Sequence, residues 1–198
     1  MAEPVKDDDL NPEQTPGFKV GEKKTIDEYQ QLDAQDESLR KWKESLGLAT
    51  GKDLSDPSDP RTCIILALTL ETADRPPIVI DLSQPGQVEK LRSEPFTIKE
   101  NAQFHLKIKF KVQHQILSGL KLIQKFTRMG LSHGQQEMIG SYAPNTADKP
   151  FYEVSFAEQD APGGLMGRGK YNATAKFVDD DKVQHLMFEW SFEVKKDW

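Results

Sequence analysis

The sequence of 198 residues has one cysteine and no long apolar run. A membrane-spanning helix needs about 20 consecutive apolar residues, so an integral membrane protein is excluded. Cys63 alone cannot form an internal disulfide, which fits a reducing cytosol. The first residues, MAEPVKDDDL, contain no apolar signal core, so secretion is not expected. The net charge of -6 argues against a nucleic-acid-binding protein.

The sequence also lacks the residue patterns of catalytic and metal sites. GLMGRGK follows a Pro-Gly-Gly turn and opens a strand, which favours a turn over a phosphate-binding loop. Ser118 lacks the flanking residues of a nucleophile elbow. Asp179, Asp180 and Asp181 favour a solvated hairpin turn, since a calcium site needs more widely spaced ligands. Metal-ligand spacing is also missing among the histidines, which are His105, His114, His133 and His185. We therefore predict no enzyme activity, no cofactor and no metal.

The charge divides the chain into two parts. Residues 1–60 contain 15 Asp and Glu but 8 Lys and Arg, a net charge of -7, whereas residues 61–198 contain 17 and 18, a net charge of +1. The first part has few aromatic residues and cannot bury enough apolar surface to offset its chain entropy. We therefore predict a flexible acidic arm over 1–60 and one folded domain over 61–198.

Two short amphipathic helices are predicted in the arm, over about 25–34 and 36–47. Thr25 begins a capping box, and Asp36 is a favourable N-cap. Each helix carries an apolar stripe, formed by Ile26, Tyr29 and Leu32 in the first and by Leu39, Trp42 and Leu46 in the second. Both are shorter than the roughly 12–15 residues that an isolated helix needs in water, so each requires a partner surface. That surface belongs either to the protein's own domain or to a partner protein.

In the second part, apolar and polar residues alternate with the period of a β-strand. FHLKIKFKV at 104–112 and LMFEWSFEV at 186–194 each place every second residue on one apolar face. The predicted inward residues are Phe104, Leu106, Ile108, Phe110, Val112, Leu186, Phe188, Trp190, Phe192 and Val194. Together with shorter segments separated by turn residues, they predict seven to nine strands. The expected fold is all-β, an antiparallel sandwich of immunoglobulin-like type.

Several motifs in the same order resemble the Rho GDP-dissociation inhibitors. They are QLDAQDESLRKWKESLG (31–47), ILSGLKLIQ (116–124), GSYAP (140–144) and FVDDDKVQHLMFEWSFEVKKDW (177–198). The resemblance runs from about Phe18 to Trp198. It implies an immunoglobulin-like sandwich with a flexible N-terminal arm that forms a helical hairpin on binding. It also implies a function: the protein binds prenylated Rho-family GTPases, blocks GDP release and extracts the GTPases from membranes by sequestering the geranylgeranyl tail.

The resemblance assigns roles to residues of both parts. In the arm, Asp36 matches the aspartate that engages the switch I threonine, and Ser38, Leu39 and Trp42 lie in the same GTPase-binding motif. Asp180 and Asp181 match acidic residues that meet switch II, which makes part of the predicted turn a contact site. The positions that match the prenyl pocket are Leu70, Phe96, Phe104, Ile116, Met166, Ala173, Phe188 and Trp190. Ala173 and Phe188 stand where relatives often carry the bulkier Ile and Trp.

The resemblance also implies the partners and the location. The expected partners are GDP-bound, geranylgeranylated GTPases of the Rho and Rac subclasses and close relatives, together with the isoprenoid tail itself. Membrane contact is expected to be transient, and the expected location is the cytosol. Three alternatives are a general carrier of prenyl or acyl tails that does not affect nucleotide exchange, an enzyme with a site hidden in the cavity, and a structural interaction domain. The switch-binding arm argues against the carrier, and the missing acid–base residues argue against the enzyme.

Overall fold

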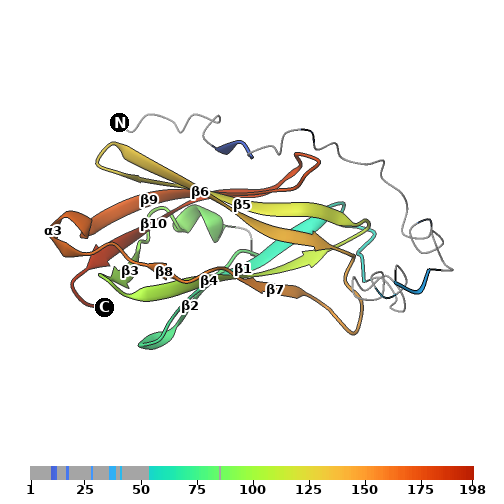
Figure 1. Cartoon of the computed structure of the whole chain (residues 1–198), viewed down its shortest axis with the longest axis horizontal. Coiled ribbons are helices and arrows are strands. Elements are labelled where there is room, and N and C mark those ends of the chain that lie inside the picture. Colours follow the sequence, from blue (N-terminus) through green and yellow to red (C-terminus); the bar gives the residue numbers. More distant parts are fainter. Residues whose placement is uncertain are drawn as a thin grey trace.

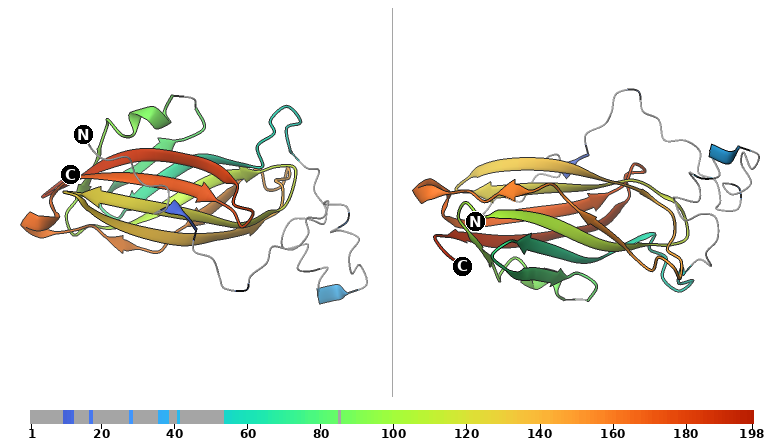
Figure 2. Two further views of the ribbon diagram at one scale, coloured as in Figure 1. Left: turned by 90° about the horizontal axis from the view of Figure 1, so that it is seen from above. Right: turned by 60° about the horizontal axis from the view of Figure 1, so that its bottom comes forward.

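Two β-sheets pack face to face in the computed structural model of the chain (Figures 1 and 2). The structure describes residues 10–12, 17, 28, 36–38, 41, 54–84 and 86–198. The first sheet has the order β2 (Arg75–Asp81), β1 (Cys63–Thr72), β4 (Gln103–Val112) and β7 (Tyr152–Ser155), with β8 (Gln159–Asp160) also paired to β4. The second sheet has the order β3 (Phe96–Lys99), β10 (Gln184–Lys195), β9 (Gly169–Val178), β5 (Leu117–Arg128) and β6 (Leu131–Tyr142). Two short helical turns, η2 (Val88–Lys90) and α3 (Gly164–Gly167), lie in connections between strands. No helix in the described ranges is long and apolar enough to cross a membrane.

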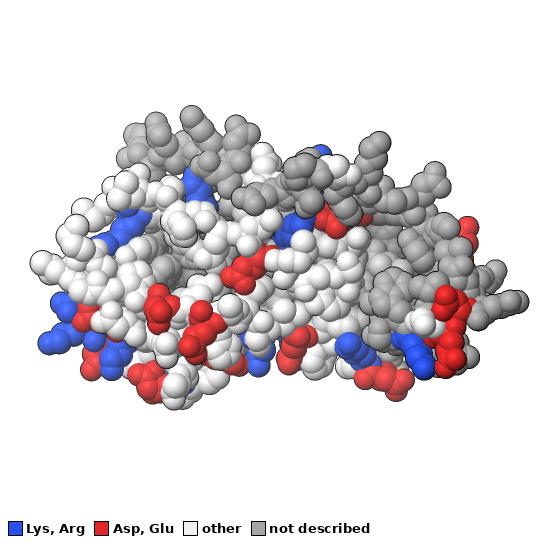
Figure 3. All heavy atoms as spheres, viewed as in Figure 1, with Lys and Arg blue, Asp and Glu red and all other residues white. Residues whose placement is uncertain are grey.

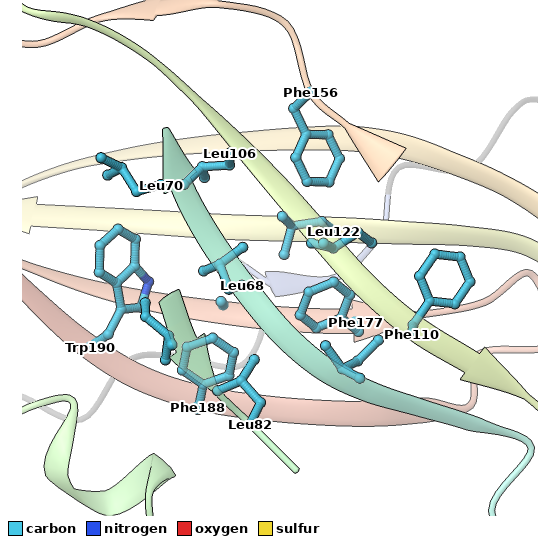
Figure 4. Close-up of a cluster of buried hydrophobic side chains, with 14 of the residues drawn as sticks. Leu68, Leu70, Leu82, Leu106, Phe110, Leu122, Phe156, Phe177, Phe188 and Trp190 are labelled. Atoms are coloured by element: carbon cyan, nitrogen blue, oxygen red, sulfur yellow. The ribbon is translucent and has the colours of Figure 1, made fainter. Parts of the chain in front are cut away.

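The predicted alternation of β4 and β10 is confirmed by burial. Ile108 and Phe110 are fully buried, and Trp190 and Val194 are nearly so, whereas Lys111 on the opposite face of β4 is exposed. These inward faces meet between the sheets and form one hydrophobic core, part of which is drawn in Figure 4. The predicted sandwich of immunoglobulin-like type is therefore confirmed, and it is held by apolar packing in place of a disulfide.

One strand pair departs from the expected antiparallel pattern. β3 runs parallel to β10, with Phe96 opposite Phe192. The connection between β2 and β3 crosses from the first sheet to the second, so β3 joins the edge of β10 in the same direction. This connection also covers the outer face of β10. Ser191, which the alternation placed outward, is buried because its N–H donates to the Leu91 carbonyl at 3.0 Å and its hydroxyl donates to the Arg92 carbonyl at 2.9 Å.

The outer face of the second sheet is covered in part by the N-terminal segment. Leu10 is fully buried and packs with Ile123 of β5 and Val178 of β9. This contact accounts for the burial of Val178 at the end of β9, a strand that is buried on both faces from Ala173 onward. The acidic arm was expected to be loosely ordered as a whole, and Leu10 is a point where it packs on the domain. Most of the predicted helices 25–34 and 36–47 lies outside the described residues.

The lone cysteine is part of the core. Cys63 begins β1 and is buried. Burial, and to a smaller extent the Asp179 carboxylate, raises the pKa of its thiol to about 12. Because the thiolate is the reactive form of cysteine, Cys63 is expected to be inert in the folded protein.

Candidate functional site

Aromatic side chains gather at one end of the sandwich, on the inner face of the second sheet. We call Phe96, Phe126, Tyr171, Trp190 and Phe192 the end cluster. The Trp190 ring centroid lies 6.3 Å from Phe96, 6.1 Å from Phe126 and 5.3 Å from Phe192. Tyr171 stacks on Phe192 at 4.8 Å with nearly parallel rings. The five residues come from β3, β5, β9 and β10, which strand pairing brings side by side.

Five of the eight predicted prenyl-pocket residues meet at this end. Phe96 and Trp190 belong to the end cluster, and Ala173 is paired with both Trp190 and Phe126. Leu70 and Phe104 come from the first sheet, and both join the same hydrophobic core. In Figure 4, Leu70 and Trp190 lie at one end of the drawn core and Phe110 at the other. Residues of both sheets therefore contribute to the core at this end, and the small Ala173 stands opposite Trp190 on the neighbouring strand.

The other three predicted pocket residues are not members of the end cluster. Phe188 is buried further along β10, where it is opposite Ala175. Ile116 directly precedes β5 and is half-buried at the far end of the sandwich. It is ten residues before Phe126, a separation of about 33 Å along an extended strand. Met166 lies in α3 at the same end as the cluster, but its side chain is 84% exposed.

Two buried polar atoms at this end have no hydrogen-bond partner within the described part of the chain. They are the indole Nε1 of Trp190 and the hydroxyl of Thr72, which is opposite Phe104 in the first sheet. Most buried donors in proteins are paired, because an unpaired one loses its hydration without compensation. The Trp190 ring is therefore held by packing alone, and the end cluster offers an almost wholly apolar surface.

The edge between β6 and β8 is polar by comparison. The Gln159 side chain donates to Glu137 at 3.2 Å, which joins the two sheets, and the Gln135 side chain donates to both Glu137 and Gln124. Desolvation raises the pKa of the Glu137 carboxyl above its ordinary value of 4.5, although the hydrogen bond from Gln159 opposes the shift. This edge is linked by a few side-chain hydrogen bonds, in contrast to the apolar contacts at the end cluster.

The acidic triplet forms the turn between β9 and β10. The buried Asp179 carboxylate accepts hydrogen bonds from the Val183 N–H and from the His185 ring, both at 2.9 Å. Lys182 adopts a positive φ of 64°, which lets the chain reverse. Asp179 thus fixes the shape of the turn, which positions the next two acidic residues near the surface.

Asp180 is already engaged by the domain. Its carboxylate accepts a hydrogen bond from the Lys121 ammonium at 2.7 Å, and the two side chains are 14% and 12% exposed. Its N–H donates to the Ser118 carbonyl at 3.0 Å. Gly119 has no side chain, and the Asp180 carboxylate occupies the space where a Cβ of residue 119 would lie. Asp181 is half-buried like Asp180, and it directly precedes the exposed tip of the turn at Lys182.

Replacing Gly119 with alanine is expected to destabilise the domain. A Cβ at this position would lie 1.9 Å from Asp180 Oδ2, and the backbone has a φ of +60°. The backbone strain alone costs about 1–2 kcal/mol, and displacement of Asp180 from Lys121 adds to it. Urea unfolding measures the loss, and Gly130→Ala is the matched control because Gly130 has a similar φ with nothing within 4 Å. Equal losses in the two variants would show that Asp180 is not held at Gly119.

Only part of the predicted arm site can be placed. Asp36 accepts a hydrogen bond from the Ser38 N–H at 2.8 Å, and Glu37, Ser38 and Lys41 are helical. Asp36 therefore acts as the predicted N-cap. Leu39 and Trp42 lie outside the described residues, and their role stays a prediction.

Several residues of the site were not singled out from the sequence. Phe126 and Tyr171 lie in predicted strands, but only the strand register shows that they join Trp190. Gln124 interrupts the apolar alternation before Phe126, which obscured the inner face of β5. The sequence analysis named Gly119 and Lys121 only as part of the motif ILSGLKLIQ. Their contact with Asp180 joins positions that are about 60 residues apart in the sequence.

The two packed sheets place the chain in the class of β-sandwich proteins. The family model described as "RHO protein GDP dissociation inhibitor" matches residues 3–197. The chain belongs to the Rho GDP-dissociation inhibitor family, whose members are regulatory inhibitors rather than enzymes. The family predicted from the sequence is therefore confirmed, and the general tail carrier is not favoured.

Relatives from distant organisms match over almost the whole chain. The chain is 46% identical to the Rho GDP-dissociation inhibitor of Saccharomyces cerevisiae, over 90% of each chain. It is 43% identical to that of Schizosaccharomyces pombe and 38% identical to Rho GDP-dissociation inhibitor 1 of Homo sapiens, in each case over 94% of this chain and 89% of the relative. Among solved structures, it is similar to a Niemann-Pick type C2 protein from Japanese carpenter ant, with a TM-score of 0.40 and 10% identity over 74% of this chain and 99% of that chain.

Proposed function

We propose that the protein binds GDP-bound, geranylgeranylated Rho-family GTPases, with the isoprenoid tail between the two sheets at the end cluster. The observation that carries this proposal is that Leu70 and Phe104 from the first sheet and Phe96 and Trp190 from the second belong to one hydrophobic core between the sheets. The arm around Asp36 and the turn at Asp180 and Asp181 contact the switch regions and slow GDP release. The complex is then a carrier in the cytosol that touches membranes only transiently.

The transfer free energy of the prenyl tail determines how much binding free energy the other contacts must contribute for extraction. Transferring about twenty carbons out of water gains roughly 16 kcal/mol at ~0.8 kcal/mol per carbon, but a bilayer offers a similar gain. The apolar site alone therefore cannot favour extraction strongly. We infer that contacts of the arm and the acidic turn with the GTPase domain supply the difference, because they form only in the complex.

The charge of the arm supports a second role for it. A basic segment next to a prenyl group is attracted to anionic lipid. The arm, with its net charge of -7 over residues 1–60, competes for such a segment and speeds the encounter. Raising the ionic strength is expected to slow the encounter, because exposed charges are screened beyond about 8 Å in physiological salt.

One titration tests the proposal directly. The full-length protein is added to vesicles that carry GDP-loaded, prenylated GTPases of the Rho and Rac subclasses, and both extraction and nucleotide release are followed. We expect extraction together with slower nucleotide release, and much weaker binding of the same GTPases without the prenyl group. Extraction with unchanged nucleotide release would instead support a general tail carrier.

Asp36→Ala is expected to separate the two activities. It removes the acceptor of the switch hydroxyl, at a cost of about 1–3 kcal/mol, while the end cluster is untouched. Release of a fluorescent GDP analogue from the complex should become faster, whereas binding of the tail stays near normal. Asp36→Asn is the matched control, because asparagine caps a helix as well as aspartate does but carries no charge. An unchanged release rate with Asp36→Ala would exclude Asp36 from the switch contact.

A further inference from the structure

The most exposed large apolar side chains of the described chain occur at one end of the sandwich. Met129 and Leu131 form the turn between β5 and β6, and they are 88% and 79% exposed. Leu165 and Met166 in α3 are 85% and 84% exposed. We call these four residues the apolar tip. The β5–β6 turn and α3 lie at the same end of the molecule in Figures 1 and 2.

Arg128 holds the two parts of the apolar tip together. It ends β5, and its guanidinium donates to the Met166 and Arg168 carbonyls. The same guanidinium lies 5.0 Å from the centre of the Tyr171 ring and donates to the Tyr171 hydroxyl at 3.3 Å. The exposed side chains are therefore presented by a braced structure.

The chain segments that form the apolar tip carry basic but no acidic side chains. Residues 127–136 and 161–178 contain no Asp or Glu, but they contain Arg128, Arg168, Lys170 and Lys176. The neighbouring Glu100 is paired with Arg168 at 2.6 Å. Figure 3 shows uncharged surface at the α3 end of the molecule, with Lys and Arg side chains beside it and both basic and acidic side chains below it. Exposed apolar residues beside basic ones are typical of surfaces that enter the interface of anionic membranes.

The apolar tip is continuous with the end cluster. Phe126 lies two residues before Arg128, and Tyr171 lies two residues after Gly169, whose position faces the Arg128 guanidinium. We propose that the apolar tip docks on anionic bilayers and brings the end cluster next to the prenyl tail that is to be extracted. This inference rests on the proposed function and adds the surface through which the protein meets the membrane.

Vesicle binding of the full-length protein without any GTPase tests this docking. The test variant is Met129→Asn with Leu131→Thr, since Met129 has a φ of 50°, which asparagine tolerates well. The matched control is Val79→Thr with Met138→Gln, which removes exposed apolar side chains from β2 and β6. We expect binding to phosphatidylcholine vesicles to increase when phosphatidylserine is added. The test variant should bind roughly tenfold more weakly, while the control binds like the unmodified protein.

A second pair of measurements separates docking from tail binding. The test variant should bind a geranylgeranylated cysteine peptide in solution with unchanged affinity, but should extract a prenylated GTPase from vesicles several-fold more slowly. Lys170→Glu should abolish the preference for phosphatidylserine. If the unmodified protein binds the peptide but not the vesicles, the docking proposal is overturned and the proposed function stays intact. If it does not bind the peptide, the proposed function is overturned. Sedimentation tests whether the apolar tip instead joins two copies of the protein. If the unmodified protein self-associates but does not bind vesicles, and the test variant no longer self-associates, membrane docking is overturned.

Discussion

Trp190→Ala is expected to lower the free energy of unfolding by about 3–5 kcal/mol and to weaken binding of prenylated GTPase far more than binding of the unprenylated form. Trp190 is buried and touches Phe96, Phe126 and Phe192, so its removal leaves a cavity in the end cluster. Chemical unfolding measures the first effect, and titration with the two forms of the GTPase measures the second.

Trp190→Phe is the control that keeps the fold. The indole Nε1 has no hydrogen-bond partner among the described residues, so phenylalanine loses volume but no hydrogen bond. Its cost in stability should therefore be well below that of alanine. If Trp190→Ala weakened binding of both GTPase forms equally, Trp190 would belong to the ordinary core and the proposed place of the tail would be wrong.

Asp179→Ala is expected to be the second most damaging change, at about 3 kcal/mol or more. It leaves the Val183 N–H and the His185 ring without their acceptor, at a place where the Asp179 and His185 side chains are almost inaccessible to water. The turn carries Asp180 and Asp181, so slowing of GDP release should be lost together with stability. Thermal unfolding and nucleotide release, measured on the same preparation, test both effects.

Two other variants separate structure from contact in this turn. Asp179→Asn keeps one carbonyl oxygen for the Val183 N–H and should cost less than alanine. Asp181→Ala should cost less stability than Asp179→Ala, because Asp181 is half-buried whereas Asp179 is buried, but it should weaken the GTPase contact. A large loss of stability with Asp181→Ala and normal nucleotide release would assign Asp181 to the fold instead of the interface.

Local sequence pattern predicted the strands well because each strand exposes alternate residues to water. β4 and β10 have a clear period of two, and their predicted inward residues are buried except Phe104 and Leu186, which are half-buried. Ser191 is the informative exception. Its burial depends on the connection between β2 and β3, which lies about 100 residues earlier in the chain, and no local pattern encodes such a contact.

The candidate site was predictable in its residue types but not in its arrangement. Trp190, Phe96 and Phe104 were assigned through the resemblance, and the structure brings them to one end. Phe126 and Tyr171 join them because β5 and β9 pair in one register. The same register places Ile116 at the opposite end of β5 from Phe126. The separation of Ile116 and Trp190 in the sequence does not reveal this distance.

The sequence by itself determined the all-β class, the acidic first third and the family, because composition, strand periodicity and ordered motifs are local properties of the chain. Only the tertiary structure decided which aromatic residues form the end cluster, how Asp180 is held by Lys121 beside Gly119, and where the apolar tip lies. These features depend on strand register and on chain crossings between sheets, which are set by packing between segments that are distant in sequence.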